Sequence, residues 1–109
     1  MTRQEFVEFL EPELKAIKDL FSLKNTCYGI EDDAFHNFRS TALRVFGTDG
    51  HETMFRTLFT YMDKHLVALA NRGIHEMEYE SRLQDIMVYS LLAIGLGRDL
   101  KQLASEQRR

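Results

Sequence analysis

The chain has 109 residues, of which 44% are hydrophobic and 28% are charged, and its formal net charge is −3 at pH 7. These numbers predict one globular domain spanning residues 1–109, with one modest core. The net negative charge argues against tight binding to a nucleic-acid backbone, which requires clustered Lys and Arg. A single cysteine, an acidic N-terminal stretch and short apolar runs are typical of a cytoplasmic protein that does not enter a membrane.

The N-terminal stretch has the pattern of a helix start. Thr2-Arg3-Gln4-Glu5 has the form of a capping box, and an apolar stripe with helical spacing follows it to about Lys24. Pro12 either kinks this helix or begins a second one at its first turn. Together with the three further helices predicted below, this gives a total of four or five helices.

Three further helices are predicted, each bounded by residues that start or stop helices. They run from Asp32 or Asp33 to Gly47, from Asp49-Gly50 to Asn71-Arg72-Gly73, and from about Glu78 to Leu103. No stretch alternates with period two, and short loops favour antiparallel neighbours. We expect an all-α, single-domain helical bundle, in which Gly95 and Gly97 allow close approach of another helix to the last one.

The segment Lys24-Asn25-Thr26-Cys27-Tyr28-Gly29 lies between the first two predicted helices and has two interpretations. In the first it is a binding loop, with Tyr28 stacking on a base and Lys24 and Asn25 reaching phosphate or ribose oxygens. In the second it is a helix C-terminus, with Lys24 interacting favourably with the helix dipole and Tyr28 filling the core. Cys27 has no evident base partner in the sequence, so a catalytic thiol is not expected.

Acidic residues recur along the last helix. Glu78 and Asp85 are seven residues apart and return to nearly the same face, Tyr89 continues that line, and Glu80 lies on a neighbouring face. Asp85 lies among apolar neighbours, so we expect it to be buried and paired with a lysine, or to face a polar pocket.

The third helix carries an acid and a lysine side by side, Asp63 and Lys64. Acids from two facing helices together with a lysine can hold a Mg²⁺ ion beside a phosphate, because Mg²⁺ prefers oxygen ligands. The alternative is that the acids of the last helix form surface ion pairs, such as Asp85 with Arg82. His51 and His75 fall in predicted loops, where water would surround them.

The order of three motifs resembles a known family. KN-x-x-YG, then D-K, then E-S-x-x-x-D-I-x-x-Y, between about Phe21 and Ile94, is similar to phage-type nucleotide-modification-associated domains, distant relatives of the MazG-like all-α nucleoside triphosphate pyrophosphohydrolases. The resemblance implies a nucleoside phosphate as ligand and leaves open Mg²⁺-dependent hydrolysis of a triphosphate. It implies the following roles: substrate binding by Lys24, Asn25, Tyr28 and Lys64, metal binding by Glu80, Asp85 and Glu78, and catalysis by Asp85 and Asp63.

A second function of a different class is also consistent with the sequence. Glu5-x-x-Glu8 and Glu8-x-x-Glu11 fit the ExxE motif of active MazG-like enzymes, but no ExxD follows in the last helix. The chain is then a non-catalytic helical interaction protein, such as a small phage accessory factor or an inhibitor of a host system, with a protein partner. Many aromatic residues in a short chain also predict a homodimer or a higher homo-oligomer.

Overall fold

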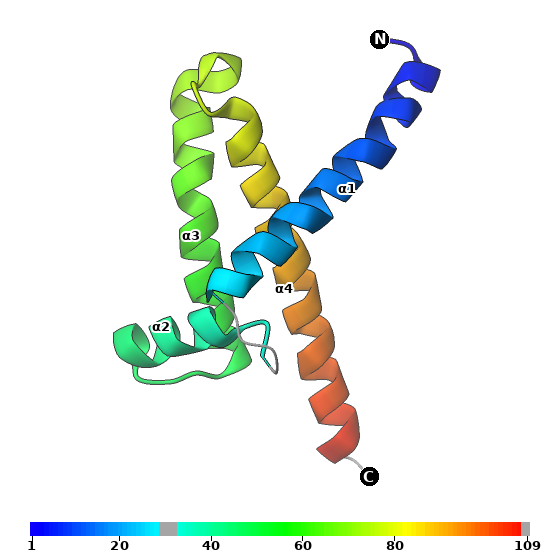
Figure 1. The fold of residues 1–109 in the computed structure, drawn as a ribbon. Coiled ribbons are helices and arrows are strands. Elements are labelled where there is room, and N and C mark those ends of the chain that lie inside the picture. The colour runs from blue at the N-terminus through cyan, green and yellow to red at the C-terminus, as the bar shows by residue number, and fades with distance from the viewer. Residues whose placement is uncertain (29–32, 108–109) are drawn as a thin grey trace.

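The computed structural model describes residues 1–28 and 33–107, with side chains described for residues 1–23 and 33–107. These residues form four α-helices and one 3-10 turn, which confirms the predicted all-α bundle (Figure 1). In chain order the elements are α1 (Arg3–Tyr28), α2 (His36–Phe46), α3 (His51–Arg72), η1 (Gly73–His75) and α4 (Tyr79–Gln107).

The first helix begins at the predicted capping box. The backbone N–H of Thr2 donates to Glu5 Oε2 at 2.7 Å, and the N–H of Glu5 donates to Thr2 Oγ1 at 3.1 Å. Pro12 lies inside α1, so this segment is one helix rather than two. The helix continues to Tyr28, and the backbone of residues 24–28 is therefore helical rather than part of a loop.

Polar and glycine residues set the ends of the next two helices. Asp33 Oδ1 accepts a hydrogen bond of 2.9 Å from the N–H of Phe35, directly before α2. Gly47 follows α2 in a left-handed conformation (φ 79°), and its N–H donates to the carbonyl of Leu43. Gly73 ends α3, also with positive φ (58°). Glycine adopts this conformation without the strain that a Cβ causes, which confirms both predicted helix ends.

The core lies where α2 packs across one end of the antiparallel pair α3 and α4 (Figure 1). The side chains of its buried cluster are Phe38, Ala42, Met54, Leu58 and Leu96. Each large apolar side chain buried in this way contributes about 1.5–3 kcal/mol to folding. This cluster also supports the aromatic residues that line the candidate site described below.

The two glycines of α4 are not close-packing positions. A Cβ placed on Gly95 would lie 3.7 Å from the ring of Phe35, an ordinary contact, and one on Gly97 would have no atom within 4 Å among the compared neighbours. Alanine is therefore accommodated at both positions. The interpretation that these glycines allow another helix to approach closely is wrong.

The N-terminal half of α1 projects away from the rest of the bundle (Figure 1). Contact with α4 begins near Glu13, whose Oε1 accepts a 3.1 Å hydrogen bond from Gln84, and Ile17 is 2% exposed. The projecting half instead leaves Phe6 and Leu10 partly in solvent. In the described part of the chain, no helix has the length and apolar character that a membrane span requires.

Candidate functional site

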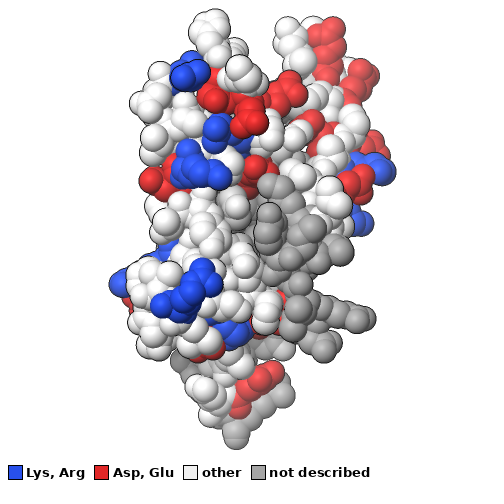
Figure 2. All heavy atoms as spheres, turned by 60° about the vertical axis from the view of Figure 1, so that its left-hand side comes forward, with Lys and Arg blue, Asp and Glu red and all other residues white. Residues whose placement is uncertain are grey.

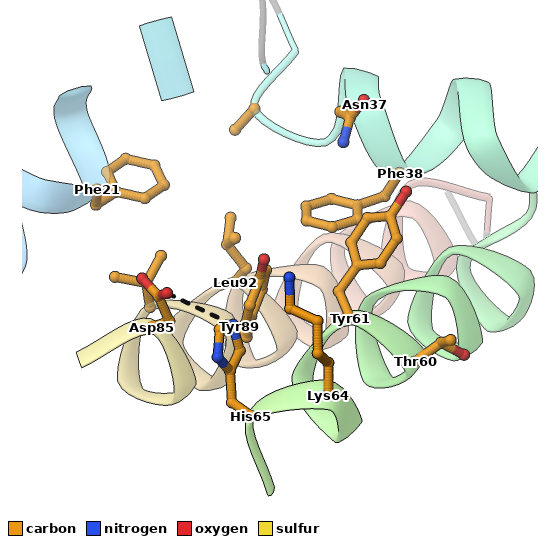
Figure 3. A pocket seen from close by; sticks show the side chains of 12 residues that line it. Phe21, Asn37, Phe38, Thr60, Tyr61, Lys64, His65, Asp85, Tyr89 and Leu92 are labelled. Carbon is orange, nitrogen blue, oxygen red and sulfur yellow. Dashed lines mark ion pairs between the residues drawn. The ribbon is translucent and has the colours of Figure 1, made fainter. Parts of the chain in front are cut away.

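A pocket of about 420 Å³ lies where side chains from α1, α3, α4 and the beginning of α2 converge (Figure 3). Its polar groups come mainly from α3 and α4, whereas apolar side chains close it from the side of α1 and α2. The lining side chains belong to Phe21, Ala34, Asn37, Phe38, Thr60, Tyr61, Lys64, His65, Asp85, Val88, Tyr89 and Leu92.

Asp85 and His65 form a buried polar pair in the wall of this pocket. Asp85, on α4, is 9% exposed, and His65, on α3, is 8% exposed. His65 Nε2 lies 3.5 Å from Asp85 Oδ2, the contact drawn as a dashed line in Figure 3. A buried carboxylate is costly without a partner, which explains the pairing. The predicted burial of Asp85 is confirmed, and among the described side chains it lies beside His65. Its predicted pairing with Lys24, whose side chain lies outside the described residues, stays a prediction.

Arg82 determines which nitrogen of His65 carries the proton. Arg82 Nη1 lies 3.3 Å from His65 Nδ1. A guanidinium has only donors, so Nδ1 is the acceptor and the imidazole proton is on Nε2, which faces Asp85. In this arrangement His65 accepts from Arg82 through Nδ1, and its Nε2 faces Asp85 Oδ2 at 3.5 Å.

Two acids hold Arg82 in place at the N-terminal end of α4. Arg82 Nε lies 3.1 Å from Glu76 Oε2, and Arg82 Nη2 lies 3.6 Å from Glu78 Oε2. The Nε–H is not aligned for a hydrogen bond, so the interaction with Glu76 is mainly electrostatic. A polar chain thus runs from Glu76 through Arg82 and His65 to Asp85. The alternative of a surface pair between Asp85 and Arg82 is therefore replaced by pairs of Arg82 with Glu76 and Glu78, of which the Glu76 contact is largely buried.

Aromatic rings form a second wall of the pocket. Tyr89 lies against the His65 ring in a stacked arrangement, with centroids 6.1 Å apart and an interplanar angle of 30°. Phe38, Tyr61 and Tyr89 form a triangle with centroid separations of 5.7, 6.4 and 6.5 Å. The hydroxyl of Tyr61 also donates to Thr41 Oγ1 at 3.1 Å. These contacts hold the ring faces in fixed positions beside the cavity.

Lys64 supplies the positive charge of the site. In Figure 3 its side chain extends beside Tyr89, and its ammonium group lies between Tyr89 and Tyr61. No carboxylate among the described side chains lies within ion-pair distance of this ammonium group. The pocket therefore combines an available cation with aromatic faces and the buried carboxylate of Asp85.

The predicted magnesium ligands are not brought together. Glu78 interacts with Arg82, Glu80 is exposed, and Asp85 is buried beside His65. Positions 78 and 85 are two helical turns apart, about 10 Å along the axis, which is too far for one ion. Within the described residues, no three His, Cys, Asp or Glu side chains are grouped to hold a metal. Among the described residues, Glu78, Glu80 and Asp85 therefore do not form one Mg²⁺ site.

The other predicted site residues fall into two groups. Lys64 lines the pocket with Asp85, whereas Asp63 is exposed on α3 and is not among the lining residues. The side chains of Lys24, Asn25 and Tyr28 lie outside the described residues. Their meeting with Asp85 in one cleft stays a prediction.

Sequence reasoning did not select His65 and Arg82, although their spacing contains a signal. Tyr61 and His65 are four residues apart with Lys64 between them, so one side of α3 presents all three. On α4, Arg82, Asp85 and Tyr89 follow at intervals of three and four. Because polar and aromatic residues recur at helical spacing on both α3 and α4, the sequence would have indicated that these two faces meet.

Comparison with known protein families, with curated protein sequences and with solved structures found no match to this chain. The resemblance to nucleotide-modification-associated domains therefore stays a prediction from sequence motifs.

Proposed function

We propose that the pocket between α3 and α4 binds a nucleoside phosphate. The observation that supports this best is the position of Lys64, whose ammonium group lies between two tyrosine rings at the pocket and has no described carboxylate as partner. A planar base needs a ring to stack on, and a phosphate needs a cation. A volume of about 420 Å³ also lies within the usual range for small-ligand pockets.

In this proposal each part of the ligand has a partner of matching chemistry. The base stacks on the face of Tyr61 or Tyr89, and the phosphate is neutralised by Lys64. Asp85 accepts a hydrogen bond from a ribose hydroxyl or a base amino group, while its contact with His65 keeps the carboxylate in position. The amide of Asn37 can both donate and accept at the opposite side of the pocket.

We further propose that the bound nucleotide is a triphosphate that the protein hydrolyses to a monophosphate and pyrophosphate. The described residues do not form a resident Mg²⁺ site, so the ion would enter bound to the nucleotide phosphates. Binding of the nucleotide is the primary activity in this proposal. In the proposed hydrolysis, Asp85, a carboxylate that lines the pocket, orients the attacking water molecule.

Calorimetric titration with nucleoside mono-, di- and triphosphates, with and without Mg²⁺, tests the binding. We expect saturable binding that Lys64→Ala weakens at least tenfold, because one charge-assisted contact to phosphate is lost. Lys101→Ala on α4 removes the same charge away from the pocket and should bind like the unchanged chain. Pyrophosphate release measured on the same samples tests hydrolysis. The proposal fails if no common or modified nucleotide binds.

A second function, a non-catalytic interaction protein, is favoured by the exposed apolar side chains of α1. Phe6 and Val7 are 50% and 52% exposed at the projecting end of that helix. The two functions make different predictions for Asp85→Asn. Nucleotide binding should fall in this variant, whereas retention of one partner from a bacterial lysate should be unaffected if the chain acts through its surface.

A further inference from the structure

The single chain exposes more surface to solvent than a compact monomeric protein of the same mass. Its accessible surface is 8352 Å², whereas a compact monomeric protein of 12.8 kDa exposes about 6,300 Å². Its radius of gyration is 16.3 Å, compared with about 13 Å for a compact domain of this length. About 2,000 Å² of surface is therefore in excess.

Much of the apolar part of this surface lies on α1 and on the face of α4 beside it. Val7, Leu10 and Leu14 follow at intervals of three and four residues and are 52%, 38% and 55% exposed. The same stripe continues to Ile17, which is buried where α1 meets α4. A stripe with this spacing packs on another helix. Its inner part has a partner in α4, and its outer part has none among the described residues.

A large apolar groove lies next to the bare stripe. It has a volume of about 600 Å³ between α1 and α4, and it is separate from the pocket of the candidate site although the two share Phe21, Ala34 and Leu92. Its other lining residues are Leu14, Ile17, Lys18, Phe35, Ile86, Met87, Ser90, Leu91 and Gly95. One chain thus carries both a projecting apolar ridge and an apolar groove.

We propose that a second copy of this chain covers this surface, with the projecting α1 of each copy lying in the α1–α4 groove of the other. A two-fold interface requires that one chain carry both complementary parts, and this chain does. The excess of about 2,000 Å² per chain exceeds the roughly 800 Å² per partner of a standard interface and lies in the range of permanent homodimers. This inference does not depend on nucleotide binding.

The charges that flank the stripe favour an antiparallel arrangement of the two α1 helices. Glu8 and Glu11 lie toward the free end, and Lys15 and Lys18 lie nearer the bundle, where Lys15 also pairs with Asp19 of the same helix at 2.8 Å. In Figure 2 acidic side chains lie at the upper right, and basic side chains appear below them together with further acidic ones. An antiparallel pair places the acids of each copy opposite the lysines of the other, whereas a parallel pair opposes like charges.

Sedimentation equilibrium between about 1 and 50 µM protein tests the association. We expect a dimer of the full chain, and we expect Leu14→Asp to shift it to a monomer because the ridge gains two buried charges per dimer. Val45→Asp is the matched control: Val45 is 59% exposed on α2, away from the groove, and this variant should stay dimeric. A monomer of the unchanged chain throughout this range overturns the proposal and assigns the surface to a different protein partner.

Reversing the charges at exposed positions of α1 tests whether the two α1 helices of the dimer are antiparallel. The variants Glu8→Lys/Glu11→Lys and Lys15→Glu/Lys18→Glu should each associate at least tenfold more weakly than the unchanged chain. An equimolar mixture should form a heterodimer with near-original affinity, since every opposed pair is then of opposite sign. A mixture that stays monomeric overturns the antiparallel pairing, even if Leu14→Asp fails to fold.

Discussion

His65 Nε2 on α3 lies 3.5 Å from Asp85 Oδ2 on α4, in a place where both residues are less than one-tenth exposed. The contact joins two antiparallel helices from inside the bundle. Because Arg82 donates to the other nitrogen of the same ring, the orientation of His65 is fixed from both sides. One face of Asp85 is thereby held at the pocket in a defined position.

Removing the carboxylate should destabilise the fold. We expect Asp85→Ala to lower the free energy of unfolding by about 3 kcal/mol, because the buried Nε2–H of His65 loses a charged acceptor. Asp85→Asn keeps an acceptor of the same shape and should lose less. Asp63→Ala, an exposed acid on α3, should change stability by no more than about 0.5 kcal/mol. Urea denaturation followed by circular dichroism measures all three, and equal effects of the two alanine variants would contradict the pairing.

Arg39 connects the segment before α2 with the turn after it. Its Nε lies 3.0 Å from Asp33 Oδ2, and its Nη1 lies 3.7 Å from Asp49 Oδ2. The side chain is 37% exposed, so we expect Arg39→Gln to cost only about 0.5 kcal/mol. Arg44→Gln, on the same helix, has neither contact among the described residues and is the control.

The cost of Arg39→Gln should not depend on pH between 6 and 9. The hydrogen bond to Asp33 raises the pKa of the Arg39 guanidinium. A cation with a raised pKa stabilises the fold at every pH below its pKa in the unfolded chain. That contribution is lost only in strongly alkaline solution, as the pH rises through the pKa of the folded state. Denaturation curves of both chains at pH 6 and pH 9 measure this, and a difference that narrows between these values would contradict the assignment.

Two glycines should respond to alanine in opposite directions. Gly97 lies inside α4 with open space around it, so Gly97→Ala should raise the free energy of unfolding by about 0.5–1 kcal/mol. Gly47 has φ 79°, and Gly47→Ala should lower it by about 1 kcal/mol because a Cβ strains that conformation. Thermal unfolding distinguishes the two, and stabilisation by both variants would refute the left-handed cap.

One prediction concerns the hydrophobic core, where Leu58 on α3 is 1% exposed. Leu58→Ala should lower the free energy of unfolding by about 3 kcal/mol, through lost burial and the cavity left behind. Leu100 makes a matched control on α4, because it is 51% exposed and its truncation should cost well under 1 kcal/mol. Comparable losses at both positions would show that Leu58 is not central to the core.

Helix boundaries followed from local chemistry and could be predicted well. The capping box at Thr2 and the glycine stops at Gly47 and Gly73 depend on neighbouring residues only, so the sequence contains them directly. Pro12 was ambiguous because proline is tolerated in the first turn of a helix and also occurs inside long helices. The structure shows one continuous helix through Pro12, and the turns that follow it are held against α4 from Glu13 onward.

The site was predicted less completely, because it depends on pairing between helices. The apolar neighbours of Asp85 indicated its burial, yet they contain no information about the helix that faces it. His65 and Arg82 become partners of the site only when α3 and α4 align in one particular register. His51 is a similar case: predicted to lie in a solvated loop, it begins α3 and its Nε2 lies 2.7 Å from Asp99 Oδ2, 48 residues later.

Pro12 lies inside α1 at the point where the helix leaves the bundle. Proline has no N–H, so the hydrogen bond to the carbonyl of Glu8 is missing there, one residue before the first contact with α4 at Glu13. The residues of α1 before Pro12 are all exposed, so their amides should exchange with solvent faster than those of α3 and α4 in a single chain. Under the proposed pairing, the protection of these amides rises with protein concentration, so the folding of this segment becomes a measure of assembly.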